Sequence, residues 1–350
     1  MKPGRTQSPA RSIRSGLASA VSCGPTPPAI RSPAIASAEA VGSDGSIVRT
    51  TQFSRITEAI IVRLVPELID LCHLGRAKVI ASWLLPGGEP ALVDCGPSTC
   101  LDALRAGLAE QGLAVADLRH LLLTHVHLDH AGAAGGLVRE NPDLLVHVSE
   151  IGAPHVVDPS RLERSARRIY GEDFDRLWGE LTPVPEANVR IVGAHVLGLD
   201  AFPTPGHASH HVSFLAADGD CFSGDASGVR ILPASYLAPV APPPDVDLEA
   251  WSRSLDALEA RRPARLRLPH FGTIVQPDEH LALMRERLAV WAQRVGGGAT
   301  VDEFVAAAEQ ELAVGADGET AASYRQAAPF WQSHAGLARY WAKKRQAEAA

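Results

Sequence analysis

The chain has 350 residues, 46% of them hydrophobic, and a formal net charge of −7. This length and composition allow one large domain with appendages and a substantial core. The acidic balance gives no electrostatic basis for nucleic-acid binding, which favours a basic patch, and no apolar stretch reaches the length of a membrane span. The five cysteines are irregularly spaced and odd in number, which favours a reducing compartment, so we expect a cytoplasmic protein.

Residues 1–50 differ in kind from the rest of the chain. They are rich in Ser, Ala, Pro and Arg and contain no acidic residue before Glu39. Such a composition cannot bury a core and predicts a disordered N-terminal extension. It is also typical of an organellar transit peptide. We expect an untargeted tail. The alternatives are a targeting segment and a start codon placed too early.

Residues 51–275 alternate between strand-like and helical patterns and form the expected main domain. Short apolar runs predict strands, which lie at residues 60–65, 79–85, 91–93, 121–124 and 145–148, with a second set within 189–222. Helical patterns cover residues 161–181 and 245–260, and leucines at helical spacing precede residue 121. Strands and helices mixed in this way favour a layered α/β sandwich.

Residues 276–350 predict a C-terminal helical region, which begins with a helix to residue 295 and breaks at residues 296–298, three glycines. Four aromatic side chains are conspicuous in a chain with only 5% aromatic residues: Phe330, Trp331, Tyr340 and Trp341. We interpret them as core packing against the main domain. The alternative is a pocket lid or a homodimer contact, for which Trp331 and Trp341 are the candidates.

The run from Leu121 to His130 carries the strongest functional signal. Its apolar start predicts the end of a buried strand, and it then places four potential ligands within six residues: His125, His127, Asp129 and His130. In extended chain His125 and His127 point the same way, whereas Asp129 and His130 begin a turn and face a neighbouring point. Burying these groups without a metal would leave many polar atoms unsatisfied. The run therefore predicts metal binding, and its arrangement suggests two metals.

Three later loops offer further ligands. Each follows an apolar stretch, and Pro or Gly marks the turn in each: Pro205-Gly206-His207, Gly224-Asp225, and Pro269-His270-Phe271-Gly272. All three fit one plan, in which a strand ends and a ligand follows on the loop. By contrast, His210 has no clear role and is interpreted as a solvent or packing residue. The other histidines outside these motifs are interpreted as structural: His73, His120, His147, His155, His195, His280 and His334.

The motifs occur in the order His-x-His-x-Asp-His, Gly-His, Gly-Asp and a late His. In this pattern the chain resembles the metallo-β-lactamase superfamily from about residue 60 to about residue 272. The earlier Asp94-Cys95-Gly96 is similar to the family's first motif. The resemblance implies the four-layer αββα sandwich of that superfamily, here with a C-terminal helical extension. It points to the glyoxalase II-like branch without specifying a substrate.

The resemblance also implies a site for two divalent ions, expected to be zinc, with manganese or iron as alternatives. Seven ligands would form two groups and a bridge: His125, His127 and His207 on one metal, Asp129, His130 and His270 on the other, and Asp225 between them. Asp94 would orient a ligand, as metal sites generally require, and His211 would support the site rather than bind metal. Cys95 and Cys221 lie near these motifs but are interpreted as small buried apolar residues.

The function implied is hydrolysis of a small ester, thioester or lactone. A metal-bound hydroxide would attack the carbonyl carbon, with Asp129 and Asp225 as the candidate catalytic residues. The partner expected is a small-molecule substrate, with neither nucleic acid nor membrane. Residues 161–181 lie between ligand motifs, where an insertion in this superfamily can wall the substrate pocket.

Several alternatives remain at this point. A persulfide dioxygenase would hold one iron on His125, His207 and Asp225, and a non-catalytic protein would use the metals for structure alone. Among the hydrolases, a glyoxalase II-like enzyme lacks a clear basic glutathione-binding pattern near the C-terminus here. A lactonase would place a Tyr after Asp225, where this chain has Ala226. An RNase Z-like nuclease would need an RNA-binding arm, and true β-lactamases generally lack the bridging Asp.

Overall fold

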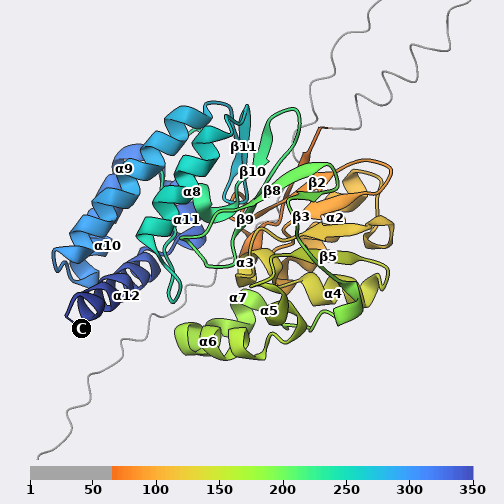
Figure 1. Cartoon of the computed structure of the whole chain (residues 1–350), viewed down its shortest axis with the longest axis horizontal. Helices are drawn as coiled ribbons and strands as arrows, with labels where there is room; N and C mark the ends of the chain where they lie inside the picture. Colours follow the sequence, from red (N-terminus) through yellow and green to blue (C-terminus); the bar gives the residue numbers. More distant parts are fainter. Residues whose placement is uncertain (1–64, 350) are drawn as a thin grey trace, which may run out of the picture.

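A computed structural model describes residues 65–349. The expected N-terminal extension lies outside the described residues, as does nearly all of the expected strand at 60–65. Within the described part of the chain, two six-stranded sheets face each other, and helices cover their outer sides (Figure 1). This is the predicted αββα layering. No helix in residues 65–349 is long and apolar enough to cross a membrane.

The first sheet has the order β1-β2-β3-β4-β5-β6. Its strands are β1 (Glu67–Asp70), β2 (Ala81–Leu85), β3 (Ala91–Val93), β4 (His120–Leu122), β5 (Leu145–Val148) and β6 (Val189–Ile191). The pairs from β1 to β3 are antiparallel, and those from β3 to β6 are parallel. The sequence did not predict β1 as a strand, because it is an edge strand with a charged residue at each end.

The second sheet has the order β12-β11-β10-β9-β8-β7. Its strands are β7 (His195–Val196), β8 (Leu199–Pro203), β9 (Val212–Leu215), β10 (Asp220–Phe222), β11 (Arg265–Leu268) and β12 (Gly272–Ile274). Strands β10 and β11 are parallel. Strand β9 is antiparallel to both β8 and β10, so β8, β10 and β11 all run in the same direction.

Alternation along the strands creates two separate apolar layers. Val93 and Leu122 belong to the cluster between the sheets, together with Phe214 and Phe222 of the second sheet. Their neighbours in the chain, among them Leu121, belong to the larger cluster that includes the outer helices. Successive residues of β4 therefore face opposite layers, and the strand is buried on both sides, as a parallel strand in a sandwich must be.

Helices cover both outer faces. Figure 1 shows α2 (Leu101–Glu110) and α4 (Ala134–Glu140) with the first sheet, and the later helices on the opposite side of the molecule. These later helices are α8 (Leu248–Ala260), α9 (Pro277–Gly296), α10 (Val301–Gly315), α11 (Gly318–Ala327) and α12 (Phe330–Glu348). Helix α9 ends at the predicted glycine break. Thr300 and Glu303 then form a reciprocal capping box that starts α10.

The four C-terminal aromatic residues do not behave alike. Phe330 and Tyr340 are buried, and Trp341 packs against the core while its Nε1 donates to the carbonyl oxygen of Ala292 at 2.8 Å. Packing is therefore confirmed for these three. It is wrong for Trp331, which is 42% exposed, because its side chain leaves the helix on the side of the large cavity described below.

Residues 160–178, here called the wall segment, contain α6 (Ser160–Tyr170), a 3-10 turn (Gly171–Asp173) and α7 (Phe174–Trp178). The predicted helix is thus interrupted at Gly171, whose φ of +56° favours glycine. The wall segment has its own apolar cluster, in which Ala166, Phe174 and Trp178 pack with Leu128. Leu128 lies between His127 and Asp129 in the chain, so residues 125–130, here called the ligand loop, anchor the wall segment directly. Two short helices flank this region, α3 (Leu128–Ala131) and α5 (Ala153–Val157).

Candidate metal centre

The candidate ligands lie at one edge of the sandwich because their strands end there. His125 and His127 follow β4, His207 follows β8, Asp225 follows β10, and His270 follows β11. Since β8, β10 and β11 share a direction, their carboxyl ends meet at the same edge of the second sheet. The structure therefore brings together all seven residues that the sequence assigned as ligands, in three overlapping groups whose ligand atoms lie within 4.8 Å of one another.

The first group consists of His125, His127 and His207. The Nε2 atom of His207 lies 3.2 Å from His125 Nε2 and 2.9 Å from His127 Nδ1. Nitrogen ligands at about 2.0–2.1 Å from a tetrahedral zinc would lie about 3.3 Å apart. These three nitrogens therefore have the spacing of a shared metal.

The second group consists of Asp129, His130 and His270. The Nε2 atoms of the two histidines are 3.3 Å apart. The Oδ2 atom of Asp129 lies 3.5 Å from His270 Nε2 and 3.8 Å from His130 Nε2. This spacing fits a second metal of the same kind.

Asp225 lies between the two groups. Its Oδ1 is 3.5 Å from Nε2 of both His130 and His270, and its Oδ2 is 3.5 Å from His207 Nε2. Each oxygen thus faces a different group. Oδ1 is buried without a hydrogen-bond partner among the described residues, which a native fold rarely tolerates. A cation between these groups would satisfy it, so the donor set fits two divalent ions with Asp225 as the bridge.

Contacts on the far side of the rings fix which nitrogen faces the centre. The Nδ1 atoms of His207 and His270 donate to the carbonyl oxygens of Val240 and Val79, each at 2.6 Å. His130 Nδ1 donates to Asp94 Oδ2 at 2.9 Å. Each of these rings therefore keeps Nε2 free to bind, which is how metal-binding histidines are generally oriented.

Asp94 lies behind the ligands, where the family resemblance placed it. Besides His130, its carboxylate accepts hydrogen bonds from the backbone N–H and the hydroxyl of Thr124, both at 2.8 Å. The backbone of Asp94 itself is left-handed, with a φ of +56°, a conformation that Asp adopts more readily than most residues. Asp94 therefore ties the end of β3 to the start of the ligand loop.

His211 contacts the backbone of the bridging residue. Its Nε2 accepts the backbone N–H of Asp225 at 3.1 Å, and its Nδ1 lies 2.8 Å from the hydroxyl of Thr204. Both ring nitrogens thus have protein partners. A Cβ at Gly224 would lie 2.4 Å from His211 Nε2. Glycine before Asp225 is required by this close approach, which explains the Gly-Asp pair.

Electrostatics prepares several ligands for metal binding. Burial holds the pKa of His125 well below its usual range and lowers the pKa of His127 to about 3. Burial opposes ionisation of Asp225, but the charges of His130, His270 and His207 outweigh it and hold the pKa of Asp225 well below its usual range. Metal ligands must be neutral imidazoles and ionised carboxylates, and these groups already have those states near neutral pH.

His130 and His270 show the opposite shift. Burial works against a proton on either ring, but Asp225 and Asp129 raise the pKa of both, and Asp94 adds to the effect at His130. Three carboxylates close to two imidazoles thus attract positive charge to the second group. Divalent cations would supply this charge in place of protons.

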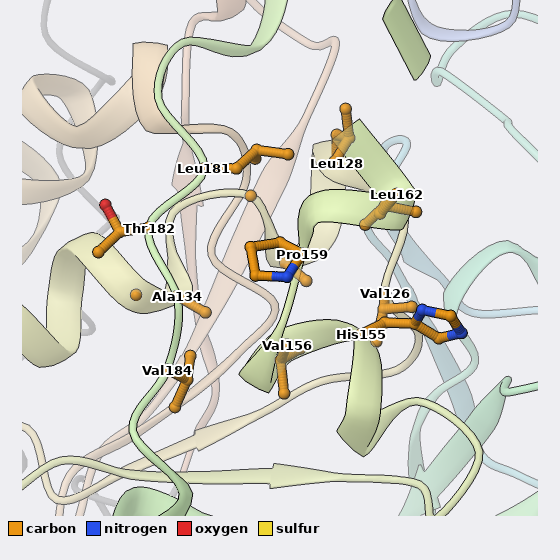
Figure 2. A pocket seen from close by; sticks show the side chains of 13 residues that line it. Val126, Leu128, Ala134, His155, Val156, Pro159, Leu162, Leu181, Thr182 and Val184 are labelled. Atoms are coloured by element: carbon orange, nitrogen blue, oxygen red, sulfur yellow. The ribbon is translucent and has the colours of Figure 1, made fainter. Parts of the chain in front are cut away.

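A cavity of about 660 Å³ opens above the ligands. Its floor includes His127, Asp129, His207, Asp225 and His270. The wall segment forms one side of it, as the family resemblance implied for residues 161–181, and residues 240–245 and 326–332 contribute to the other sides. A second, apolar cavity of about 20 Å³ lies at the base of α6, where Figure 2 shows Pro159, Leu162 and Val156.

Sequence reasoning missed three histidines of this cavity. His210 is 6% exposed and its Nδ1 accepts the backbone N–H of Val126 at 3.3 Å, so packing was the correct one of its two interpretations. It also lines the cavity, as do His73 and His155. The position of His210 three residues after His207 was the one available signal, and nothing in the sequence around His73 or His155 indicated this place. Cys95 and Cys221 are buried, as expected.

The family profile of the metallo-beta-lactamase superfamily matches residues 75–270, more than half of the chain. The chain belongs to this superfamily. Among curated relatives, the metallo-beta-lactamase fold-containing protein ST1585 of Sulfurisphaera tokodaii is 29% identical over 187 residues, which cover 48% of this chain and 66% of that protein. A hydroxyacylglutathione hydrolase of Cupriavidus taiwanensis is 29% identical over 168 residues, which cover 45% of this chain and 54% of that enzyme. A ribonuclease of Thermus thermophilus, TTHA0252, is 30% identical over 179 residues, covering 48% and 40%.

The chain therefore spans less than two thirds of the length of these relatives. Solved structures show the same fold over more of the chain. The crystal structure of ST1585 superposes with a TM-score of 0.56 at 21% identity, covering 78% of this chain and 98% of that one. The metallo-beta-lactamase family protein TTHA1429 of Thermus thermophilus superposes with a TM-score of 0.54 at 22% identity, covering 76% of this chain and 89% of that one.

Proposed function

We propose that the protein is a binuclear metal-dependent hydrolase that cleaves a small ester, thioester or lactone. The observation that carries this proposal is the pair of candidate ligand groups with Asp225 between them at the floor of a large cavity. A purely structural metal site is closed by protein ligands, whereas the side chain of Asp129 is 23% exposed. An open cavity over the ligands favours catalysis over a structural role.

Two divalent ions bound here would lower the pKa of a coordinated water and polarise a substrate carbonyl. The chain would hold them with the first group, the second group and Asp225. Asp129 borders the cavity and is placed to accept a proton from an attacking water at its partly exposed carboxylate. Asp94, Val79 and Val240 keep the histidine rings in position during turnover.

Tyr170 is a candidate for contact with the substrate carbonyl. Its ring lines the cavity at the end of α6, and its hydroxyl oxygen accepts a hydrogen bond from Gln332 Nε2 at 3.1 Å. Among the described residues no acceptor takes the hydroxyl proton of Tyr170. Burial and the nearby Asp129 raise the pKa of this phenol, so it stays protonated. Tyr170 is therefore able to donate to an oxygen that gains negative charge, the role that oxyanion-stabilising donors have in acyl transfer.

The substrate classes follow from the site and from the relatives. The hydroxyacylglutathione hydrolase relative supports a thioester, and the ribonuclease relative supports a phosphodiester. We favour the carbonyl substrates because the chain is acidic overall, with a net charge of −7, whereas nucleic-acid binding depends on neutralising phosphates with cations. The second ligand group also favours this proposal over a dioxygenase with one iron, which would leave Asp129 and His130 unused.

The test is a screen of the metal-loaded full-length protein against p-nitrophenyl esters, acyl thioesters, lactones and a phosphodiester. We expect turnover of at least one carbonyl class, lost in Asp225→Ala and after chelation. Glu286→Ala serves as the control, because Glu286 is an exposed residue of α9 that does not line the cavity. Turnover of the phosphodiester alone would replace the carbonyl proposal with a nuclease. Persulfide oxidation by an iron-loaded protein would replace it with the dioxygenase.

A further inference from the structure

Two arginines of the wall segment line the cavity without a partner. Arg161 and Arg168 both border the cavity above the ligands. Among the described residues, neither guanidinium has a hydrogen bond or a carboxylate within 4 Å, whereas most other arginines do. A contrasting case is Arg167 on the same helix, which pairs with Glu163 at 2.9 Å and with Asp175 at 2.7 Å. Arg161 and Arg168 are thus positive charges of the cavity that no described protein group neutralises.

Their spacing places both on one face of α6. Seven residues are close to two helical turns, so the two side chains share a face and lie about 10 Å apart along the axis. The residues of α6 between them that also line the cavity are Leu162, Ser165 and Ala166, and Ile169 follows them. A largely apolar strip therefore accompanies the two cations on the cavity side of the helix.

The rest of the cavity complements this face. Trp178 of the wall segment, Trp331 of α12 and the three prolines 242–244 add apolar surface. Two carboxylates outside the metal centre also line the cavity, and both have partners: Asp173 pairs with Arg176, and Asp245 accepts a hydrogen bond from Ser209. The floor carries the metal ligands, where the reacting bond would lie. A substrate that uses the whole cavity therefore needs three parts: a reactive carbonyl, an apolar body and a negatively charged end.

We infer that Arg161 and Arg168 bind an anionic group of the substrate, a carboxylate or a phosphate, at the end of an acyl chain whose carbonyl lies over the metal centre. This inference rests on the proposed function. The planar guanidinium group with its fork of N–H donors matches both anions. Binding an anion costs little free energy here, because both arginines are exposed to water and neither gives up an existing ion pair.

The test compares three p-nitrophenyl esters of equal chain length with the metal-loaded full-length protein. One carries a terminal methyl ester, one a free carboxylate (the adipic acid monoester) and one a phosphonate. We expect the charged esters to have the higher kcat/KM, and Arg161→Gln and Arg168→Gln each to lower it about ten-fold for a charged ester. The neutral ester should keep its kcat/KM within about two-fold in the same variants, and raising the salt concentration should weaken only the charged esters.

Arg164→Gln provides the matched control, because Arg164 is an exposed arginine of the same helix that does not line the cavity. Its kcat/KM should be unchanged for all three esters. The preferred anion, carboxylate or phosphonate, identifies the natural group. Equal losses for neutral and charged esters, or a loss in Arg164→Gln as large as in the other two, would overturn the inference and leave the proposed function intact. Failure to cleave even the neutral ester would count against the proposed function itself.

Discussion

Asp94 is the residue through which the two halves of the ligand set depend on each other. Its carboxylate contacts His130, a candidate ligand of the second group, and Thr124, which precedes His125 of the first group. Thr124 Oγ1 also lies 3.0 Å from His125 Nδ1. One carboxylate therefore orients imidazoles in both groups, although it lies outside the metal-binding shell.

Replacing Asp94 with Ala should weaken metal binding without removing a ligand. Loss of a supporting partner of this kind typically costs about 10–100-fold in metal affinity. We expect that range for the more weakly held ion, measured by competition with a chromophoric chelator at pH 7. Asp94→Asn should lie between the alanine variant and the wild type, since it keeps one acceptor oxygen. Wild-type affinity in Asp94→Ala would show that His130 is positioned by other contacts.

Tyr170→Phe should reduce turnover and spare the metals. The substitution removes only the hydroxyl, so metal content should stay at the wild-type value while kcat falls about ten-fold or more, as loss of an oxyanion donor does. Gln332→Leu, which removes the partner of that hydroxyl, should have a smaller effect of the same kind. An unchanged kcat in Tyr170→Phe would assign the residue to packing alone.

Acid sensitivity should arise partly from His280, which is fully buried on α9. Burial lowers the pKa of His280 to about 4 in the folded protein, whereas its pKa is near 6.5 when the chain unfolds. Above about pH 6.5 His280 is neutral in both the folded and the unfolded protein. As the pH falls from about 6.5 toward 4 only the unfolded state takes up the proton, so the folded state loses stability, by about 2 kcal/mol at pH 5.

Urea unfolding of the metal-free protein at pH 7 and pH 5 measures this contribution. His280→Gln cannot be protonated and keeps a donor for the carbonyl oxygen of Ser227, which His280 Nε2 now contacts at 2.9 Å. The variant should therefore lose less stability between the two pH values than the wild type. An identical loss in both proteins would mean that other groups carry the acid sensitivity.

At the scale of elements, the wall segment is held between the ligand loop and the chain that leads back to the first sheet. Its cluster contains Leu128 from the ligand loop and Trp178 from α7, and the chain then passes α4 at Thr182. Gly135 of α4 lies at this crossing, and a Cβ there would come within 1.8 Å of the carbonyl oxygen of Thr182. Close packing of α4 against this connection thus fixes the chain just after the wall segment ends.

Gly135→Ala should therefore destabilise the protein, whereas its neighbour Gly136→Ala should not. At Gly136 the new Cβ would lie 3.3 Å from a flexible side chain, Leu101 Cδ1, and alanine favours the helix by about 0.5–1 kcal/mol. We expect a loss of about 2 kcal/mol or more for Gly135→Ala, the cost of overpacking a rigid site. Thermal unfolding of the two variants, Gly135→Ala and Gly136→Ala, measures this loss of stability. Equal melting temperatures would show that the connection moves freely.

At the scale of the whole molecule, the sequence predicted what local patterns encode. A ligand loop that directly follows a buried strand, as His125 to His130 follow β4, shows both the element and its chemistry within a short stretch of chain. Only one side of the cavity, residues 161–181, was expected, and that from the family resemblance. The rest could not be predicted in this way, since His73, His210 and Trp331 reach the cavity from three separate parts of the chain. Trp331 was assigned to the core because its spacing in a helix does not show which side faces a cavity. Strand β1 was missed because an edge strand with charged ends lacks the apolar run that predicts a strand.

Elemental analysis of the purified full-length protein tests most directly whether the chain holds two divalent ions in one shared site. We predict two ions per chain, of zinc or manganese, with His127→Ala retaining fewer and Asp225→Ala losing both or nearly both, because Asp225 contacts both groups. The control variant Glu286→Ala should keep two. One ion per chain, or full metal content in Asp225→Ala, would contradict the shared site.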